Sequence, residues 1–66
     1  MEKRSVIKTG AKGTEYTYHF TVDVANDQLY LNAVTVKGQD ITEVIDNEIL
    51  QGVYNEQYQQ WIMAAA

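Results

Sequence analysis

Few side chains in this sequence could act in acid–base or nucleophilic chemistry. The chain has one histidine, His19, one serine, Ser5, and no cysteine. His19 could exchange a proton near neutral pH. Its candidate partner Asp23 lies four residues further along an extended segment, about 13 Å away at the rise of a strand, which is too far for a hydrogen bond. Ser5 is expected to face the core side without a nearby base, so we predict no catalytic residues and no enzyme.

Carboxylates in the second half of the chain could suggest a cation site, and four of them are closely spaced: Asp40, Glu43, Asp46 and Glu48. Spacing of this kind along one helix spreads side chains around its surface. Calcium instead needs six to eight oxygens, which a loop wrapping the ion normally supplies. We therefore predict a solvated acidic helix surface, with no metal site and no cofactor.

Aromatic side chains could stack on bases or fill a core. Tyr16, Tyr18 and Phe20 alternate as in sheets that bind single-stranded nucleic acid. They share their face with large aliphatic residues, so we predict that they belong to the core. Tyr54, Tyr58, Trp61 and Ile62 form a helical stripe. This stripe could contact a partner, because Tyr and Trp are enriched at interfaces, or it could be buried within the monomer.

The element that must position these residues is the stretch 15–24, in which apolar and polar residues alternate without interruption. Period-two alternation of this length is typical of a strand with one buried face. We expect a strand at 15–24 in the centre of the sheet, with neighbouring strands at about 4–9 and 28–37. Two-residue loops, Ala11-Lys12 and Asn26-Asp27, would place Ile7 opposite Tyr16 and Val24 opposite Leu29.

The expected registers leave a second, partly apolar sheet face. It would hold Tyr30, Val34, Val36 and His19, with Val6 from the first strand. Arg4 and Lys8 would lie near this outer face as well. A sheet face that is fully exposed to solvent would carry mainly polar side chains. Because this face is partly apolar, we expect these residues to take part in partner binding.

A helix is predicted at about 40–63. Asp40 and Glu43 fit a capping-box-like start, and apolar residues recur at helical spacing from Ile41 to Val53. The stripe rotates after Gly52, which leaves two possibilities open. The helix could continue through Gly52, or Gly52 could end one helix and Asn55 could cap a second.

Length and charge limit the remaining interpretations. Sixty-six residues suggest a single small domain, 1–66, of marginal stability. The net charge is −4, and residues 38–66 carry five acids and no base. This acidity disfavours nucleic acid as a general partner. The N-terminus resembles no signal peptide and no apolar run could span a membrane, so we expect a cytoplasmic protein.

Together these observations predict an α+β fold, in which a three-stranded antiparallel meander is packed on one face by a C-terminal helix. The leading functional hypothesis is a non-enzymatic protein-interaction module that forms a homodimer through its aromatic helix and outer sheet surfaces. The partner-binding residues would be Tyr54, Tyr58, Trp61, Ile62, Tyr30, Val34, Val36 and His19. One alternative is a nucleic-acid-binding domain that uses the exposed sheet face. Another is a small inhibitor that docks its acidic helix on a basic partner site.

Overall fold

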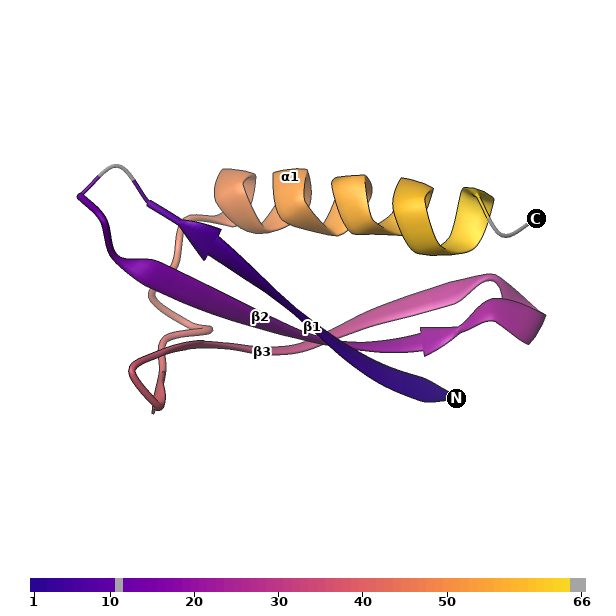
Figure 1. The fold of residues 1–66 in the computed structure, drawn as a ribbon, viewed down its shortest axis with the longest axis horizontal. Coiled ribbons are helices and arrows are strands. Elements are labelled where there is room, and N and C mark those ends of the chain that lie inside the picture. Colours follow the sequence, from indigo (N-terminus) through magenta and orange to yellow (C-terminus); the bar gives the residue numbers. More distant parts are fainter. Residues whose placement is uncertain (11, 65–66) are drawn as a thin grey trace.

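The computed structural model describes residues 1–10 and 12–64. Within these residues the chain forms a four-stranded antiparallel sheet and one C-terminal helix that lies over one face of it (Figure 1). The elements in chain order are β1 (Glu2–Thr9), β2 (Glu15–Asp23), the 3-10 turn η1 (Val24–Asn26), β3 (Gln28–Val36), β4 (Gln39–Asp40), α1 (Asn47–Tyr58) and the π-helical turn η2 (Gln59–Met63). The predicted α+β fold is confirmed, and the two-residue β4 is an addition to it.

The alternating stretch forms β2, with β1 on one side and β3 on the other. Its residues Tyr18, Phe20 and Val22 are buried, as the alternation predicts, and with Leu29 and Val34 of β3 they form the sheet side of the core. Val24 lies in η1 and is exposed, because β2 ends at Asp23.

The register predicted between the first two strands is wrong by one residue. Val6 pairs with Tyr18, and Ile7 pairs with Thr17 rather than with Tyr16. The Gly10 amide donates to the Thr14 carbonyl at 2.8 Å, so the loop has three residues rather than two. Ala11 of the predicted Ala11-Lys12 loop lies outside the described residues. A slip of one residue exchanges the two faces of a strand, so Val6 packs against the core and Ile7 is exposed.

The register between β2 and β3 also differs from the prediction, for two reasons. Residues 24–27 form a longer turn than the two-residue loop expected, with Asp27 in the left-handed region at φ 54°, so Val22 rather than Val24 pairs with Leu29. A bulge then interrupts the ladder, and Asn32 is the extra residue between the pairs Phe20–Leu31 and His19–Ala33. A bulge reverses which side chains face the core beyond it.

The helix begins at Asn47, later than the predicted position 40. Asp46 is its N-cap and accepts a hydrogen bond from the Glu48 amide at 2.8 Å. Asp40 lies in β4 and instead accepts bonds from the amide and hydroxyl of Thr42. Because β4 pairs with β3, Asp40 is held in an extended strand and cannot begin a helix.

The helix continues through Gly52, and no second helix is capped at Asn55. Its last turn widens into η2, where the Ala64 amide donates to the Gln59 carbonyl five residues earlier. The C-terminal half of α1 and η2 supply the other side of the core. Ile62 is buried, and Trp61 meets the ring of Phe20 edge-on, with centroids 5.3 Å apart. Gln57, for which sequence reasoning gave no signal, is also buried on this side.

Candidate functional site

The aromatic stripe predicted for partner binding packs within the chain itself. Tyr54, Tyr58 and Trp61 are half-buried against the core cluster, and Ile62 is fully buried in it. The Tyr54 hydroxyl donates to the Leu29 carbonyl at 2.7 Å. These contacts favour the intramolecular possibility for the stripe and leave only parts of the three aromatic rings exposed to solvent.

The predicted outer-face residues are divided between the two sides of the sheet. The placement of Val34 on the outer face is wrong, because the bulge turns it into the core, where it is 0% exposed. Val36 follows two residues later, so it points to the same side as Val34 and is half-buried. Tyr30 remains exposed, and half-buried His19 forms a 2.9 Å hydrogen bond with the Thr35 hydroxyl.

The corrected register also moves the basic residues of β1. The guanidinium of Arg4 lies 5.4 Å from the centroid of the Trp61 ring, and the Lys8 ammonium contacts Glu56 of α1 at 2.8 Å. Both side chains therefore lie on the helix side of the sheet. Ser5 pairs with His19 on the outer face, contrary to the core-side position predicted for it, while the imidazole bonds to Thr35.

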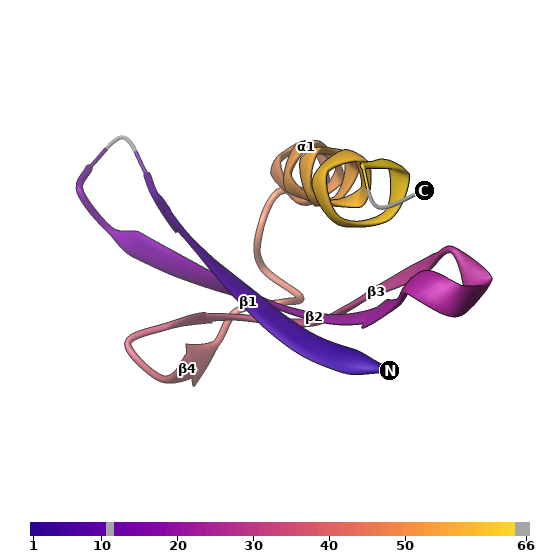
Figure 2. The same cartoon turned by 45° about the vertical axis from the view of Figure 1, so that its right-hand side comes forward.

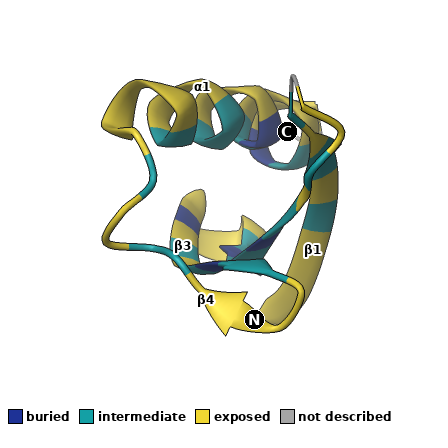
Figure 3. Ribbon diagram, turned by 90° about the vertical axis from the view of Figure 1, so that its left-hand side faces the viewer, coloured by how far each residue is buried: buried dark blue, intermediate teal, exposed yellow. Residues whose placement is uncertain are grey.

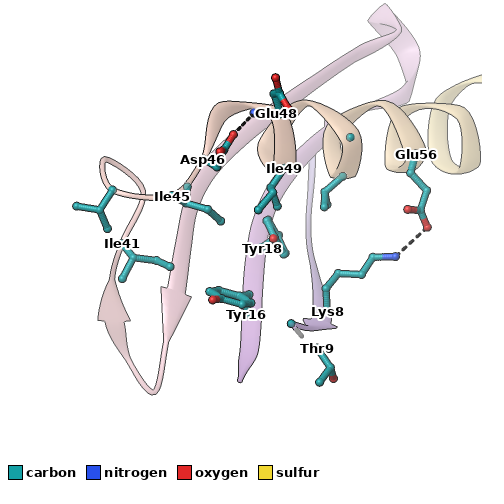
Figure 4. Close-up of a pocket in the computed structure, with 14 residues that line it drawn as sticks. Lys8, Thr9, Tyr16, Tyr18, Ile41, Ile45, Asp46, Glu48, Ile49 and Glu56 are labelled. Carbon is teal, nitrogen blue, oxygen red and sulfur yellow. Dashed lines mark hydrogen bonds and ion pairs between the residues drawn. The ribbon is translucent and has the colours of Figure 1, made fainter. Parts of the chain in front are cut away.

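A groove lies between the first half of α1 and the β1–β2 hairpin, and we call it the docking groove (Figure 4). It has a volume of about 720 Å³. Its apolar lining comes from β2, from the segment 41–46 and from α1, and consists of Tyr16, Tyr18, Ile41, Val44, Ile45, Ile49, Gly52 and Val53. In Figure 4 the labelled isoleucines of the helix side face the two tyrosines of β2.

Local structure explains why this groove is open. Ile41 and Ile45 are held in a tight turn, in which the Ile45 amide donates to the Ile41 carbonyl at 3.0 Å. The Ile41 amide in turn donates to the Val34 carbonyl, which fixes the turn to β3. Figure 2 shows the β1–β2 hairpin extending beyond the helix on the other side. As a result Val44 is 81% exposed and Ile49 is 53% exposed.

Charged groups border the docking groove unevenly. At one end Lys8 and Glu56 neutralise each other across the gap between β1 and α1. At the other end Asp46 and Glu48 line it without a basic neighbour among the lining residues. Burial, together with the neighbouring Tyr16, raises the pKa of Tyr18 in the groove wall, and Lys8 acts in the opposite direction. Its phenol, like any tyrosine hydroxyl at neutral pH, can donate a hydrogen bond.

The sequence predicts that the aliphatic part of this site belongs to the core. Helical spacing places Ile41 to Val53 on a helix face packed on the sheet, whereas the late start of α1 makes part of this segment a surface. The signal that could have identified this is Asp46, a second potential N-cap followed two residues later by an acidic residue.

Two further features were sought in residues 1–10 and 12–64, a metal-binding cluster and a membrane-spanning helix. These residues contain no group of three or more His, Asp or Glu side chains placed to hold a metal ion. None of their helical segments combines the length and apolar character that crossing a membrane would need. Comparisons of this chain with protein-family models, with curated proteins and with solved structures find no significant match.

Proposed function

We propose that this chain is a non-enzymatic protein-interaction module, and that its docking groove binds a short apolar segment of a partner protein that also carries Lys or Arg. The observation that supports this most strongly is the open apolar lining of the groove, which includes two exposed aliphatic residues, Val44 and Ile49. Contiguous exposed apolar surface, rimmed by polar groups, is characteristic of interaction sites.

Gly52 adds an independent argument for an occupant. Glycine in a helix interior is less favourable than alanine by about 0.5–1 kcal/mol. Apart from its chain neighbours and the adjacent backbone of the helix, no atom of the described residues lies within 4 Å of the position that a Cβ would take, so packing inside the chain does not require the glycine. Gly52 lines the docking groove, and a partner that approaches the helix backbone closely would account for the missing side chain.

The charge around the groove defines the chemistry of the partner. Asp46 and Glu48 line the end where α1 begins, and Asp40 and Glu43 are exposed on the segment before it. A bound segment with only apolar residues would leave these carboxylates without a counter-charge. Lys or Arg next to the apolar residues would pair with them and speed association at low salt.

Selection from a display library of random linear peptides tests this proposal without knowledge of the natural partner. We expect enriched peptides to combine aliphatic or aromatic residues with adjacent Lys or Arg. Ile49→Gln should weaken binding of a synthetic selected peptide about fivefold, because about 1 kcal/mol of apolar burial is lost from a half-exposed side chain. Ile7→Gln is the matched control, since Ile7 is 61% exposed but lies outside the groove.

Three outcomes would contradict the proposal. One is that no peptide is enriched, and another is that Ile49→Gln and Ile7→Gln weaken binding equally. The third is a set of purely basic peptides without apolar residues. That result would favour the alternative of an inhibitor that presents its acidic segment to a basic site. The nucleic-acid alternative has lost support, because Arg4 and Lys8 lie on the helix side of the sheet rather than on its exposed face.

A further inference from the structure

Strand β1 forms one edge of the sheet and is a second candidate interaction surface. The strand order is β1-β2-β3-β4, so β1 pairs with β2 on one side only. Six of its eight residues are exposed, with Val6 and Lys8 half-buried, and Figure 3 shows this exposure along the strand. An edge strand of this length presents backbone donors and acceptors that another strand can use.

The hydrogen-bond pattern of the hairpin shows which residues offer these groups. The Gly10 amide donates to the Thr14 carbonyl, and this pair continues the β1–β2 register. In an antiparallel ladder, bonded and non-bonded pairs alternate. The even-numbered residues of β1 therefore direct their backbone groups at β2. Lys3, Ser5 and Ile7 direct theirs outward, to the free edge.

We infer that a second copy of this chain pairs with β1, antiparallel, about a two-fold axis at Ser5. Hydrogen bonds between the two strands form only if residues with outward-directed backbone groups lie opposite one another. These are the odd-numbered residues, so the register must pair odd with odd residues. Shifting the axis to Arg4 places Arg4 opposite itself, and shifting it to Val6 places Arg4 opposite Lys8. With the axis at Ser5, Glu2 lies opposite the partner's Lys8 at both ends of the ladder.

Of these three registers, only the axis at Ser5 makes charge and packing complementary, and there the Glu2 carboxylate, which contacts Arg4 of its own chain at 3.2 Å, would also reach the partner's Lys8. Cross-strand pairs of opposite charge stabilise antiparallel strands, and like charges directly opposite destabilise them. Lys8, which already contacts Glu56, would lie between that carboxylate and the partner's Glu2. On the outer face the aliphatic stem of the partner's Lys3 would cover Ile7, which is 61% exposed in the single chain. This inference concerns a different surface from the docking groove and does not depend on it.

A charge exchange between two variants tests both the dimer and its register. In homodimers of Glu2→Lys, lysine would oppose Lys8 at both ends, and in homodimers of Lys8→Glu, glutamate would oppose Glu2. In a mixture of the two variants every such pair is again lysine with glutamate. We expect sedimentation equilibrium to show that each variant alone associates roughly ten- to thirtyfold more weakly than the wild type, and that an equimolar mixture recovers the wild-type affinity at low salt.

Several results would overturn the inference. One is a wild-type chain that is monomeric at its highest soluble concentration. Another is that the variants associate as strongly as the wild type. A third is a mixture that does not recover association although circular dichroism shows that both variants are folded. Ile49→Gln serves to separate the two proposals. It should leave self-association unchanged, so a failure of the groove proposal and a failure of the dimer would be observed in different experiments.

Discussion

Replacing Gly52 with alanine should stabilise the folded chain. Gly52 lies in the interior of α1, where glycine costs about 0.5–1 kcal/mol relative to alanine through backbone entropy. Beyond its chain neighbours and the adjacent helix backbone, the new methyl group would meet no atom of the described residues within 4 Å, so no clash offsets the gain. For a domain of this size, 1 kcal/mol corresponds to about 4–8 °C in Tm. We therefore expect Tm to rise by roughly 2–8 °C.

The assay is urea and thermal denaturation followed by helical circular dichroism. Gly13→Ala is a matched control, because the surroundings of Gly13 are equally empty but its φ is +80°. Alanine in this left-handed region costs about 1 kcal/mol or more, so Gly13→Ala should lower Tm. The pair separates an effect of backbone conformation from an effect of added volume.

A destabilised Gly52→Ala variant would refute this reasoning, since it would mean that another part of the protein occupies the space beside Gly52. A second comparison links the prediction to function. If a partner approaches the helix backbone at Gly52, the same substitution should weaken binding of a selected peptide while it raises Tm. A variant that is more stable and binds equally well would remove Gly52 from the argument for the docking groove.

Three further predictions concern hydrogen bonds seen in the structure. Tyr54→Phe removes the donor to the Leu29 carbonyl and should lower the free energy of unfolding by about 1 kcal/mol in urea titrations; an unchanged value would mean that water replaces the bond. Thr42→Val leaves the Val34 amide without its acceptor and should cost about 1–3 kcal/mol, whereas Thr42→Ser, which keeps the hydroxyl, should cost less. The two bonds from Thr42 lower the pKa of the Asp40 carboxyl, so its contribution to stability is present above its ordinary pKa and is lost as pH falls through the lowered value. Asp40→Asn should therefore make stability less sensitive to acid, and an identical pH profile would contradict this assignment.

The sequence predicted β2 and its buried side chains correctly, because the alternation of apolar and polar residues within the strand is enough to identify both. Tyr18, Phe20 and Val22 are buried wherever the neighbouring strands happen to align. The fold class followed for the same reason, since one alternating strand with two apolar neighbours and a helical stripe can be combined in few ways. The continuity of α1 through Gly52 was left open by the sequence, because the apolar stripe rotates at this glycine while no proline interrupts the helix.

Registers could not be predicted, because they depend on the length of each turn. The first loop has three residues, with Gly13 at positive φ, and the prediction of two residues moved Val6 and Ile7 to the wrong faces. In β3 the sequence offered little indication of the bulge at Asn32. Only an extra residue there places Leu31 and Val34 on the same side of the sheet. The Asn32 amide donates to the Thr21 hydroxyl at 2.7 Å, a contact that the alternation does not reveal.

The start of the helix affects both the fold and the candidate site. A helix from 40 to 63 would be about 36 Å long, while a nine-residue strand such as β2 spans about 30 Å, so one end would extend beyond the sheet. The structure resolves this mismatch by beginning α1 at Asn47 and folding Ile41 and Ile45 into a turn.

The aliphatic residues that indicated a sheet-packed helix are thereby divided into two groups. Leu50 and Val53 join the core cluster, while Ile49 and Val44 remain more than half exposed. The two groups should respond differently to the same change. Leu50→Gln removes a side chain that contacts the core and should destabilise the fold, whereas Ile49→Gln should affect stability little and peptide binding substantially. Equal effects on stability would mean that Ile49 is an incompletely packed core residue, and the docking groove would then have no functional argument in its favour.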